Sequence, residues 1–324
     1  MLRRTTAIAA ALFGLACAAP STQAADYPNK PITLIIGFAP GGPSDVLARL
    51  LTKKMDEILK QTLVIENRPG AGGSIAGAAV ARAAPDGYTI LLATGSLLAI
   101  NVTLYKNIGY DPEKDFEPIT LIGTQTNVLY THPSLPAKTL AELIAYAKAN
   151  PGKLSFGSGG NGTPAHLAGE MLKIEANIDM THVPFRGTGP ALQNVIAGHV
   201  PMAFNPPPPL LPHIQSGAIR AVAVSTLKRT AALPDVPTIA ESGFPGFDAT
   251  TWHALVAPAG TPKEIIDALH RAAIGSLNDP ETHKALTELG VDVVGSTPEE
   301  LRAYISSEIP KWAKIVKASG AKVD

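Results

Sequence analysis

Two glycine-rich loops contain the residue types best suited to chemistry in this 324-residue chain. The first runs from Phe38 to Asp45 and the second from Phe156 to Thr163, and each follows an apolar run and precedes an amphipathic stretch. The first turn of a helix presents backbone N–H groups without intrahelical partners, and glycine lets a ligand approach that backbone closely. Each loop therefore predicts a cradle for an anion. Two cradles in different halves of the chain predict one anion that is held from both sides.

Each residue of the first loop also has a structural interpretation. Gly41 and Gly42 are as typical of an ordinary tight turn as of a ligand cradle. Asp45 falls in the first turn of the following helix, where a carboxylate favours the positive end of the helix dipole, so capping is its favoured interpretation. Phe38 either belongs to the core or flanks a bound ligand, and residue type alone does not separate the two.

The second loop matches the pattern G-x-G-x-x-G through Gly157, Gly159 and Gly162, which is also typical of dinucleotide-binding folds. A dinucleotide site further needs an acidic residue at the end of the next strand to bind the ribose. That strand ends instead in Val183-Pro184-Phe185-Arg186. The glycine pattern is therefore weak support for a nucleotide, and we expect no cofactor.

Further polar residues are expected at the same strand-to-helix edges. Thr163 is predicted to cap the second helix, which places His166 in its first turn, either near a ligand or in a structural role. Arg186 follows a strand and either pairs with a second carboxylate or is a solvated surface arginine. Thr94 and Ser96 leave the third strand and offer two hydroxyls, although loop chemistry explains them nearly as well.

The sequence lacks the common catalytic and metal-binding patterns. No G-x-S-x-G nucleophile elbow is present, the eight histidines show no H-E-x-x-H spacing, and the only cysteine is Cys17. The phosphate-binding pattern G-x-x-x-x-G-K-[ST] is also missing. We therefore expect a binding site without a catalytic residue, a metal or a covalent step.

The first 24 residues are typical of a secretory signal peptide. Arg3 and Arg4 precede an apolar stretch at residues 7–19, and Thr22-Gln23-Ala24 supplies small residues for a cleavage site. We expect export to the periplasm and a soluble mature protein. Lipid attachment at Cys17 is a weaker alternative, since Gly14 stands where such a signal usually has a leucine-like residue.

The charge of the chain is balanced. It has 27 basic and 27 acidic residues, and removal of Arg3 and Arg4 with the signal leaves 25 against 27, a net charge of −2. Such a balance argues against binding to nucleic acid or to an anionic membrane surface. Selectivity for an anion therefore has to be local.

The elements that must position the loops alternate between strand and helix patterns. In the first half, strand patterns at residues 31–38, 62–66 and 88–93 alternate with helix patterns at 46–59 and 75–84. The second half repeats this order, with strands at 154–157, 180–183 and 201–204 and helices at 165–175 and 191–197. The alternation predicts an α/β fold of two lobes, each built on parallel strands with right-handed crossovers.

Two segments are predicted to cross between the lobes. Residues 110–130 contain Pro112 and Pro118, and their extended run at 119–123 suits a crossing segment better than a buried element. A second crossing is expected between Ser225 and Trp252. We assign residues 25–124 and 247–324 to lobe 1 and residues 125–246 to lobe 2, with a cleft that closes about hinges.

The C-terminal part returns to helices. Thr261 and Thr297 are each followed by proline and, three residues on, by glutamate. Each threonine is therefore predicted to cap a helix through a capping box, with the proline as first helical residue. The two Thr-Pro-x-Glu patterns therefore indicate helix starts and not a functional site.

Longer motifs extend the pattern over the chain from about Tyr27 to Lys322. They are Phe38-Ala39-Pro40-Gly41-Gly42, Glu66-Asn67-Arg68-Pro69-Gly70-Ala71-Gly72-Gly73, Ala84-Pro85-Asp86-Gly87-Tyr88, Gly160-Asn161-Gly162-Thr163 with His166-Leu167-Ala168-Gly169-Glu170, Leu233-Pro234-Asp235-Val236-Pro237-Thr238, and Ala257-Pro258-Ala259-Gly260-Thr261-Pro262. In combination they resemble the Bug-type solute receptors, the extracytoplasmic binding proteins of tripartite tricarboxylate transporters.

The resemblance implies a two-lobed periplasmic binding protein of type II, a Venus flytrap that closes on a small carboxylate such as a dicarboxylate, an amino acid or an aromatic acid. In that family a ligand carboxylate is held by loops matching Ala39–Ser44 and Ser158–Thr163, which coincide with the two cradles. The candidate ligand-binding residues are Phe38, Ala39, Pro40, Gly41, Gly42, Ser44, Thr94, Ser96, Ser158, Gly160, Asn161, Gly162, Thr163, His166, Arg186 and Asn205.

One position departs from the family pattern. After the strand that ends in Phe204 the family commonly has an aspartate, whereas this chain has Asn205 followed by prolines at 206–209. Asparagine donates and accepts hydrogen bonds without charge, whereas an aspartate repels a second carboxylate or attracts an ammonium. Our hypothesis is that the ligand lacks an amino group at this point and is a dicarboxylate or an aromatic acid.

The expected function is the capture of an organic carboxylate by a monomeric receptor that delivers it to membrane permease subunits. Two alternatives stay open on the sequence. A ligand-loaded receptor also suits a sensor kinase of a two-component system, and an exported enzyme acting on a carboxylate is a third, less favoured function. Turnover distinguishes the enzyme, because a receptor returns its ligand unchanged.

Overall fold

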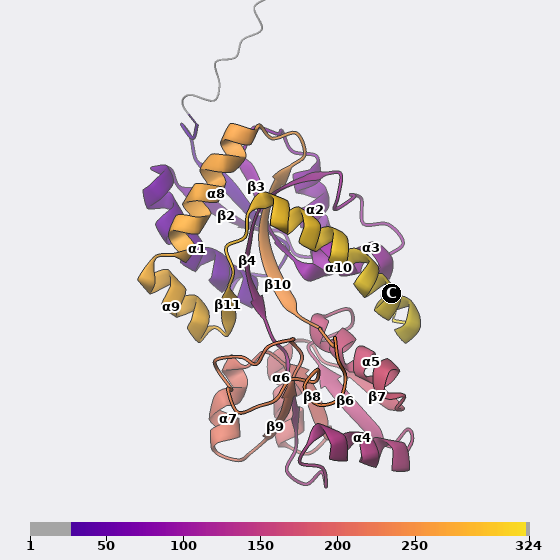
Figure 1. Ribbon diagram of the computed structural model, residues 1–324. Helices are drawn as coiled ribbons and strands as arrows, with labels where there is room; N and C mark the ends of the chain where they lie inside the picture. Colours follow the sequence, from indigo (N-terminus) through magenta and orange to yellow (C-terminus); the bar gives the residue numbers. More distant parts are fainter. Residues whose placement is uncertain (1–26, 322–324) are drawn as a thin grey trace, which may run out of the picture.

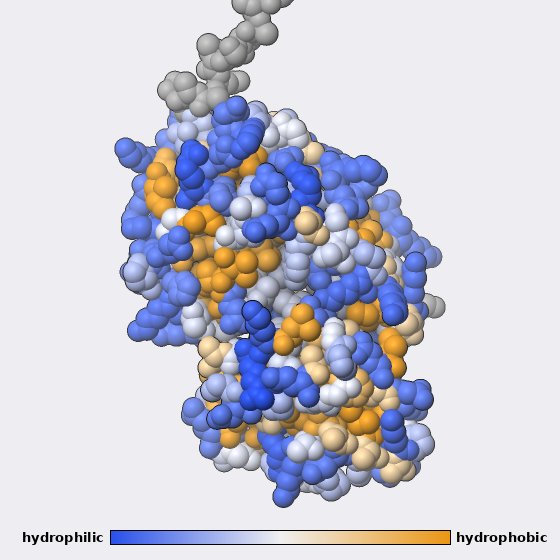
Figure 2. Space-filling model, in the orientation of Figure 1, coloured by the Kyte–Doolittle hydropathy of each residue, from blue (hydrophilic) through white to orange (hydrophobic). Residues whose placement is uncertain are grey.

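The alternating strand and helix patterns fold into two α/β lobes (Figure 1). The computed structural model describes residues 27–321, so the predicted signal peptide and Cys17 lie outside the described residues. No helix among residues 27–321 combines the length and the apolar character needed to cross a membrane. Figure 2 shows hydrophilic side chains spread over the visible face of both lobes, with apolar patches on either side of the narrow junction between them.

The first lobe is built on a six-stranded sheet in the order β11-β4-β10-β3-β1-β2. The strands are β1 (Ile32–Ile36), β2 (Leu63–Asn67), β3 (Thr89–Thr94), β4 (Phe116–Gln125), β10 (Thr251–Pro258) and β11 (Val291–Val293). The first three are parallel as predicted, and β10 and β11 each pair antiparallel with β4. The apolar run of β1 is buried along most of its length, as expected for a parallel strand covered on both faces.

Helices cover both faces of this first sheet (Figure 1). One face packs on α1 (Pro43–Leu59), α8 (Lys263–Leu277) and α9 (Pro280–Glu288). The other packs on α2 (Ser74–Ala81), the π-helical turn η2 (Ser96–Ile100), α3 (Asn101–Leu104) and α10 (Pro298–Ser319), and a short 3-10 turn, η1 (Ala71–Gly73), precedes α2.

The second lobe is built on a five-stranded sheet in the order β7-β6-β8-β5-β9. Its strands are β5 (Val128–Thr131), β6 (Leu154–Ser158), β7 (Met180–Pro184), β8 (Met202–Asn205) and β9 (Arg220–Val224). Strand β6 pairs parallel with β7 and β8, whereas β5 is antiparallel to β8 and β9. The helices are α4 (Leu140–Ala149), α5 (Pro164–Ala176), α6 (Thr188–Ile196) and α7 (Leu211–Gln215), with a 3-10 turn η3 (Pro208–Leu210).

The chain passes between the sheets twice. The first sheet takes its strands from residues 32–125 and 251–293 and the second from residues 128–224. The passages therefore fall at residues 126–127 and between β9 and β10. The exact lobe boundaries, 124/125 and 246/247, stay predictions.

The first passage lies within residues 110–130, but the interpretation of their run at 119–123 as a crossing segment rather than a buried element is wrong. They belong to β4, a ten-residue and almost wholly buried strand between β10 and β11. Proline was misleading here because Pro118 pairs with Val256 beside a register shift in the ladder, and such irregularities tolerate a residue without an N–H.

The two predicted C-terminal caps differ in outcome. Thr297 caps α10 through a complete capping box with Glu300, as predicted. The cap predicted at Thr261 is wrong, since α8 begins at Lys263 with Pro262 as N-cap and no side-chain cap. The hydroxyl of Thr261 donates instead to the Pro258 carbonyl at 2.7 Å, which closes the turn before the helix.

A buried carboxylate ties α10 to the second passage between the lobes. Glu308 Oε2 accepts from the indole N–H of Trp252 at 3.0 Å and of Trp312 at 2.8 Å. Lys311 Nζ donates to Glu308 Oε1 at 2.7 Å and to Asp248 Oδ2 at 2.9 Å. Because Asp248 lies just before β10, this network links the last helix to the segment that joins the lobes.

Replacement of Glu308 by leucine is expected to lower the free energy of unfolding by about 3 kcal/mol, because two buried indole N–H groups lose their acceptor and Lys311 loses one of its two carboxylates. Urea denaturation of purified protein measures the change. The matched control is Glu299→Ala on the same helix, where Glu299 is exposed and a change within about 0.5 kcal/mol is expected. Equal effects of the two substitutions would contradict this account of Glu308.

Candidate functional site

Both glycine loops connect the C-terminal end of a parallel strand to the N-terminus of a helix, as predicted. The first follows β1 and leads into α1, whose N-cap is Gly42 in an extended conformation. The second follows β6 and leads into α5, whose N-cap is Thr163. The Thr163 side chain accepts from the His166 N–H at 3.2 Å, which confirms the predicted cap. Each loop thus directs the positive end of a helix dipole toward the edge of its own sheet.

The first loop closes around a buried carboxylate of its own. Asp45 is 2% exposed and accepts from the backbone N–H of Gly41 at 3.0 Å and from Asn67 Nδ2 at 3.1 Å. The guanidinium of Arg49 donates to both of its oxygens. Hydrogen bonding by Arg49, followed by the Gly41 N–H, lowers the pKa of Asp45 to about 2. The N-terminus of α1 therefore already holds one ionised carboxylate.

The second loop is held by neutral groups. Gly160 N–H donates to Ser158 Oγ at 3.2 Å, Thr163 Oγ1 donates to the Gly160 carbonyl at 2.8 Å, and Gly162 N–H donates to His166 Nδ1 at 3.1 Å. No acidic residue lies in the first turn of α5. In contrast to α1, the positive end of α5 is therefore not complemented by a carboxylate of its own first turn.

Gly162 also brings the second loop against the first lobe. It has a φ of +73°, and a Cβ built at this position would lie 2.4 Å from Leu104 Cδ2 of α3. Only glycine meets both requirements without a shift of its neighbours. A predicted ligand residue is thus also a point of close packing between the lobes.

A buried histidine, His166, and a half-buried one, His182, contact the second loop. The rings of His166 and His182 stack with their centroids 3.9 Å apart, and His182 Nε2 lies 2.7 Å from Ser158 Oγ. Burial, reinforced by the charge of Lys173, lowers the pKa of His166 to about 4. Burial, reinforced by His166 and Lys173, lowers that of His182 to about 3. His166 is therefore a neutral support whose Nδ1 is already used by the loop.

The remaining predicted residues divide between the core and the surface. Phe38 is half-buried and packs against the core of the first lobe. Thr94 is buried and its Oγ1 accepts from the Leu97 N–H at 3.4 Å, while the partly exposed Ser96 begins η2. The exposed residues are Ala39, Pro40, Gly41, Asn161 and Arg186.

Asn205 is completely buried at the end of β8. Its Nδ2 donates to the Tyr130 hydroxyl at 3.0 Å and to the Thr188 carbonyl at 2.9 Å. Its Oδ1 has no hydrogen-bond partner within the described part of the chain. With the amide nitrogen in use, the group left on Asn205 is an acceptor, which suits a hydroxyl or N–H donor rather than a second carboxylate.

A cavity of about 250 Å³ brings residues of the two lobes together. Gly41 and Pro43 line it from the first loop, and Thr188 and Pro206 line it from the second lobe. The second loop lies next to the wall of this cavity. A Cβ built at Gly159 of the loop would be 3.4 Å from the backbone nitrogen of Thr188, which lines the cavity. Ser158, Asn161, Thr163 and Arg186 do not line it.

His253 of β10 also lines this cavity and was missed in the sequence. Its Nε2 lies 3.2 Å from Ser44 Oγ, and its Nδ1 has no partner among the described residues. Burial lowers the pKa of His253 to about 4. No local pattern in the sequence indicates this role, because His253 comes to the site only through the antiparallel pairing of β10 with β3 and β4.

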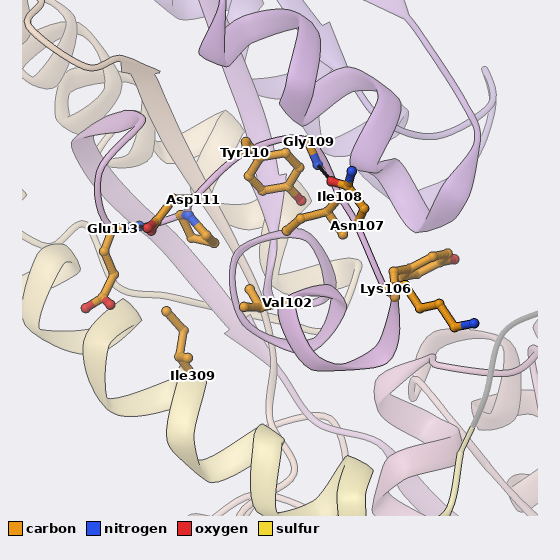
Figure 3. Close-up of a pocket in the computed structure, with 11 residues that line it drawn as sticks. Val102, Lys106, Asn107, Ile108, Gly109, Tyr110, Asp111, Glu113 and Ile309 are labelled. Atoms are coloured by element: carbon orange, nitrogen blue, oxygen red, sulfur yellow. Dashed lines mark hydrogen bonds between the residues drawn. The ribbon is translucent and has the colours of Figure 1, made fainter.

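A larger hollow of about 440 Å³ lies elsewhere on the first lobe, between the end of α3 and α10 (Figure 3). Tyr105, Lys106, Tyr110, Glu113 and Ile309 are among the residues that line it. It contains none of the predicted ligand residues. Among the described residues no group of three or more histidine, cysteine or acidic side chains is arranged to hold a metal.

The three histidines with lowered pKa values, His166, His182 and His253, predict a loss of stability in mild acid. The unfolded chain binds protons below a pKa of about 6.5, whereas folded His166 and His253 do so only near 4 and His182 near 3. The free energy of unfolding should therefore fall as the pH drops below about 6.5, by up to about 1.4 kcal/mol per pH unit for each histidine.

Thermal unfolding between pH 7 and pH 4.5 tests this, with His182→Gln as the variant. Its melting temperature should fall less steeply than that of the wild type, because one histidine with a lowered pKa is gone. His199→Gln, at an exposed histidine, should leave the slope unchanged. If the melting temperature of His182→Gln fell with pH as steeply as that of the wild type, protonation of His182 would not govern acid stability.

Comparison with known proteins shows the family to which this chain belongs. The family model described as "Tripartite tricarboxylate transporter family receptor" matches residues 47–321. The protein BugT of Bordetella pertussis is 37% identical to this chain, over 99% of each sequence. The resemblance seen in the sequence motifs is thereby confirmed.

Solved structures of relatives share the fold. Rpa4515 from R. palustris, solved with adipate, is 36% identical with a TM-score of 0.80 and covers 92% of this chain and 100% of its own. MatC from Rhodopseudomonas palustris, solved with bound malate, is 34% identical with a TM-score of 0.77 and covers 90% of this chain and 100% of its own. The predicted two-lobed α/β fold is confirmed, and the chain belongs to the tripartite tricarboxylate transporter family receptors, the Bug-type periplasmic solute-binding proteins.

Proposed function

We propose that this protein captures a small organic carboxylate between its two lobes for uptake. The observation that carries the proposal is the N-terminus of α5, where a glycine loop packs against the first lobe and no acidic residue occupies the first turn. Such a terminus favours an anion through its backbone N–H groups and its dipole. The adipate and malate in the two related structures support a carboxylate as that anion.

The predicted ligand residues keep distinct roles in this proposal. The loop from Ser158 to Thr163 binds the ligand carboxylate, and the first loop from Ala39 to Ser44 covers the rest of the ligand from the other lobe. Thr94, Ser96 and Arg186, which lie at or just after strand ends of the two lobes, are proposed as further ligand contacts. Phe38, His166 and the side chain of Thr163 support the loops, because their described contacts are with the protein itself.

The proposed setting is the periplasm, reached through the signal peptide at residues 1–24. The mature receptor is a monomer that presents its closed, loaded form to the permease subunits of a tripartite tricarboxylate transporter. It releases its ligand unchanged, so incubation with a bound acid should leave the concentration of that acid constant. Consumption of the acid would assign the protein to the enzymes instead.

A thermal-shift screen of mono-, di- and tricarboxylates and amino acids tests the proposal directly. A ligand at 100 times its dissociation constant should stabilise the mature protein by about 2.7 kcal/mol. Complete absence of shifts over the whole panel would count against a carboxylate receptor.

Substitution of Gly41 by leucine should abolish the shift of any acid found. A Cβ at Gly41 meets no heavy atom within 4 Å, so the new side chain enters the open space above the first loop. Gly41 has a φ of +77°, and the substitution is therefore expected to cost about 1–2 kcal/mol of stability as well.

The matched control is Gly260→Leu. Gly260 has a φ of +81° and equally open surroundings, but it lies in the turn before α8. This variant should lose similar stability and keep the ligand-induced shift. Retention of the full shift in Gly41→Leu would remove the first loop from the site.

A further inference from the structure

The cavity beside the first loop has no charged residue in its lining. Nine of the twelve lining residues are glycine, proline or aliphatic, and the other three are Gln125, Thr188 and His253. An ionised group enclosed by such walls loses hydration without gaining a partner of opposite charge. The cavity therefore suits an apolar part of a ligand with few polar atoms.

His253 is the polar side chain best placed to recognise such a part. It is 5% exposed, lines the cavity and has one ring nitrogen, Nδ1, without a partner in the described structure. Its Nε2 is already in contact with Ser44 Oγ, which fixes the ring. Because the folded protein keeps this histidine neutral, it offers a hydrogen bond without a charge.

Asn205, on the opposite lobe, is likewise a buried, uncharged side chain with one polar atom left without a partner among the described residues. Its amide nitrogen is bound to the carbonyl of Thr188, a residue of the cavity wall, and its unpartnered Oδ1 is an uncharged acceptor. Neither His253 nor Asn205 compensates the charge of a carboxylate or an ammonium group in the way an ion pair does.

The charges at the N-termini of α1 and α5 support the same conclusion. At α1 the carboxylate of Asp45 already lies in the first turn and accepts from the backbone N–H of Gly41 in the first loop. A ligand carboxylate beside Gly41 would be repelled by the negative charge of Asp45. Arg49, the cation nearest to Asp45, already forms an ion pair with it. At α5 the first turn has no acidic residue, so the charged end of a ligand is favoured there.

From this asymmetry we infer that His253 and the apolar cavity bind the uncharged end of the ligand. The solute is then a monocarboxylate whose body is apolar and carries one uncharged hydrogen-bonding group, such as a hydroxyl, in place of a second carboxylate or an ammonium. The inference rests on the proposed function and specifies its ligand class, and it names His253 as a specificity-determining residue.

Acids of one length that differ only at the far end test the inference. Isothermal titration of the mature protein compares 6-hydroxyhexanoate with adipate and 6-aminohexanoate, and 4-hydroxybenzoate with terephthalate. In at least one series the hydroxy acid should bind at least tenfold more tightly than its charged counterparts. Equal or tighter binding of the dicarboxylates or the amino acid overturns this inference and leaves the proposed carboxylate receptor intact. Absence of binding by every acid, in this set and in the wider screen, overturns both.

Substitutions at His253 assign the preference to a residue. His253→Phe fills the same space without a polar atom and should reduce the preference for the better hydroxy acid to less than threefold. His253→Asn returns a polar atom near the Nδ1 position and should restore part of it. His199→Phe, at an exposed histidine outside the cavity, should leave it unchanged. Because the acids are first compared on the wild type, poor folding of a variant does not decide the outcome. An undiminished preference in folded His253→Phe overturns the role of this histidine.

Discussion

Backbone N–H groups in the first turns of α1 and α5 have no acceptor within their helices, and the architecture is organised around this deficit. Parallel strands bring both helix starts to the edges of their sheets, where the lobes meet. The two ends are completed differently: α1 uses the carboxylate of Asp45, whereas α5 uses the hydroxyl of Thr163 and the ring of His166. One end is therefore close to electrostatic balance, and the other retains its attraction for an anion.

The connection between the lobes has its own requirements. One core cluster includes Leu91 and Trp252 of the first lobe together with Phe156 and Leu167 of the second. Along this cluster Glu308 accepts from two indoles and pairs with Lys311, which also reaches Asp248. Movement of the lobes consequently has to preserve a packed, hydrogen-bonded hinge rather than bend a free linker.

Local signals in the sequence predicted local structure well. The strand before each glycine loop, the cap at Thr163 and the capping box at Thr297 depend on neighbouring residues, and all were predicted. Errors arose where distant partners decide the outcome. The missed cap at Thr261 is a local exception, because its hydroxyl donates to the Pro258 carbonyl three residues earlier. Pro118, by contrast, is accommodated in a buried strand by the bulge opposite Val256. His253 was invisible for the same reason, because only the antiparallel insertion of β10 brings it to Ser44.

The contact between Gly162 and Leu104 links residues from different lobes at a separation that leaves no room for a methyl group. The positive φ of Gly162 restricts this position further, so enlarging it requires both a smaller residue at 104 and a backbone that accepts the new side chain. The two positions consequently cannot evolve independently. An enlargement of residue 162 therefore has to be accompanied by a smaller side chain at 104 in the other lobe, so these two positions change as a pair.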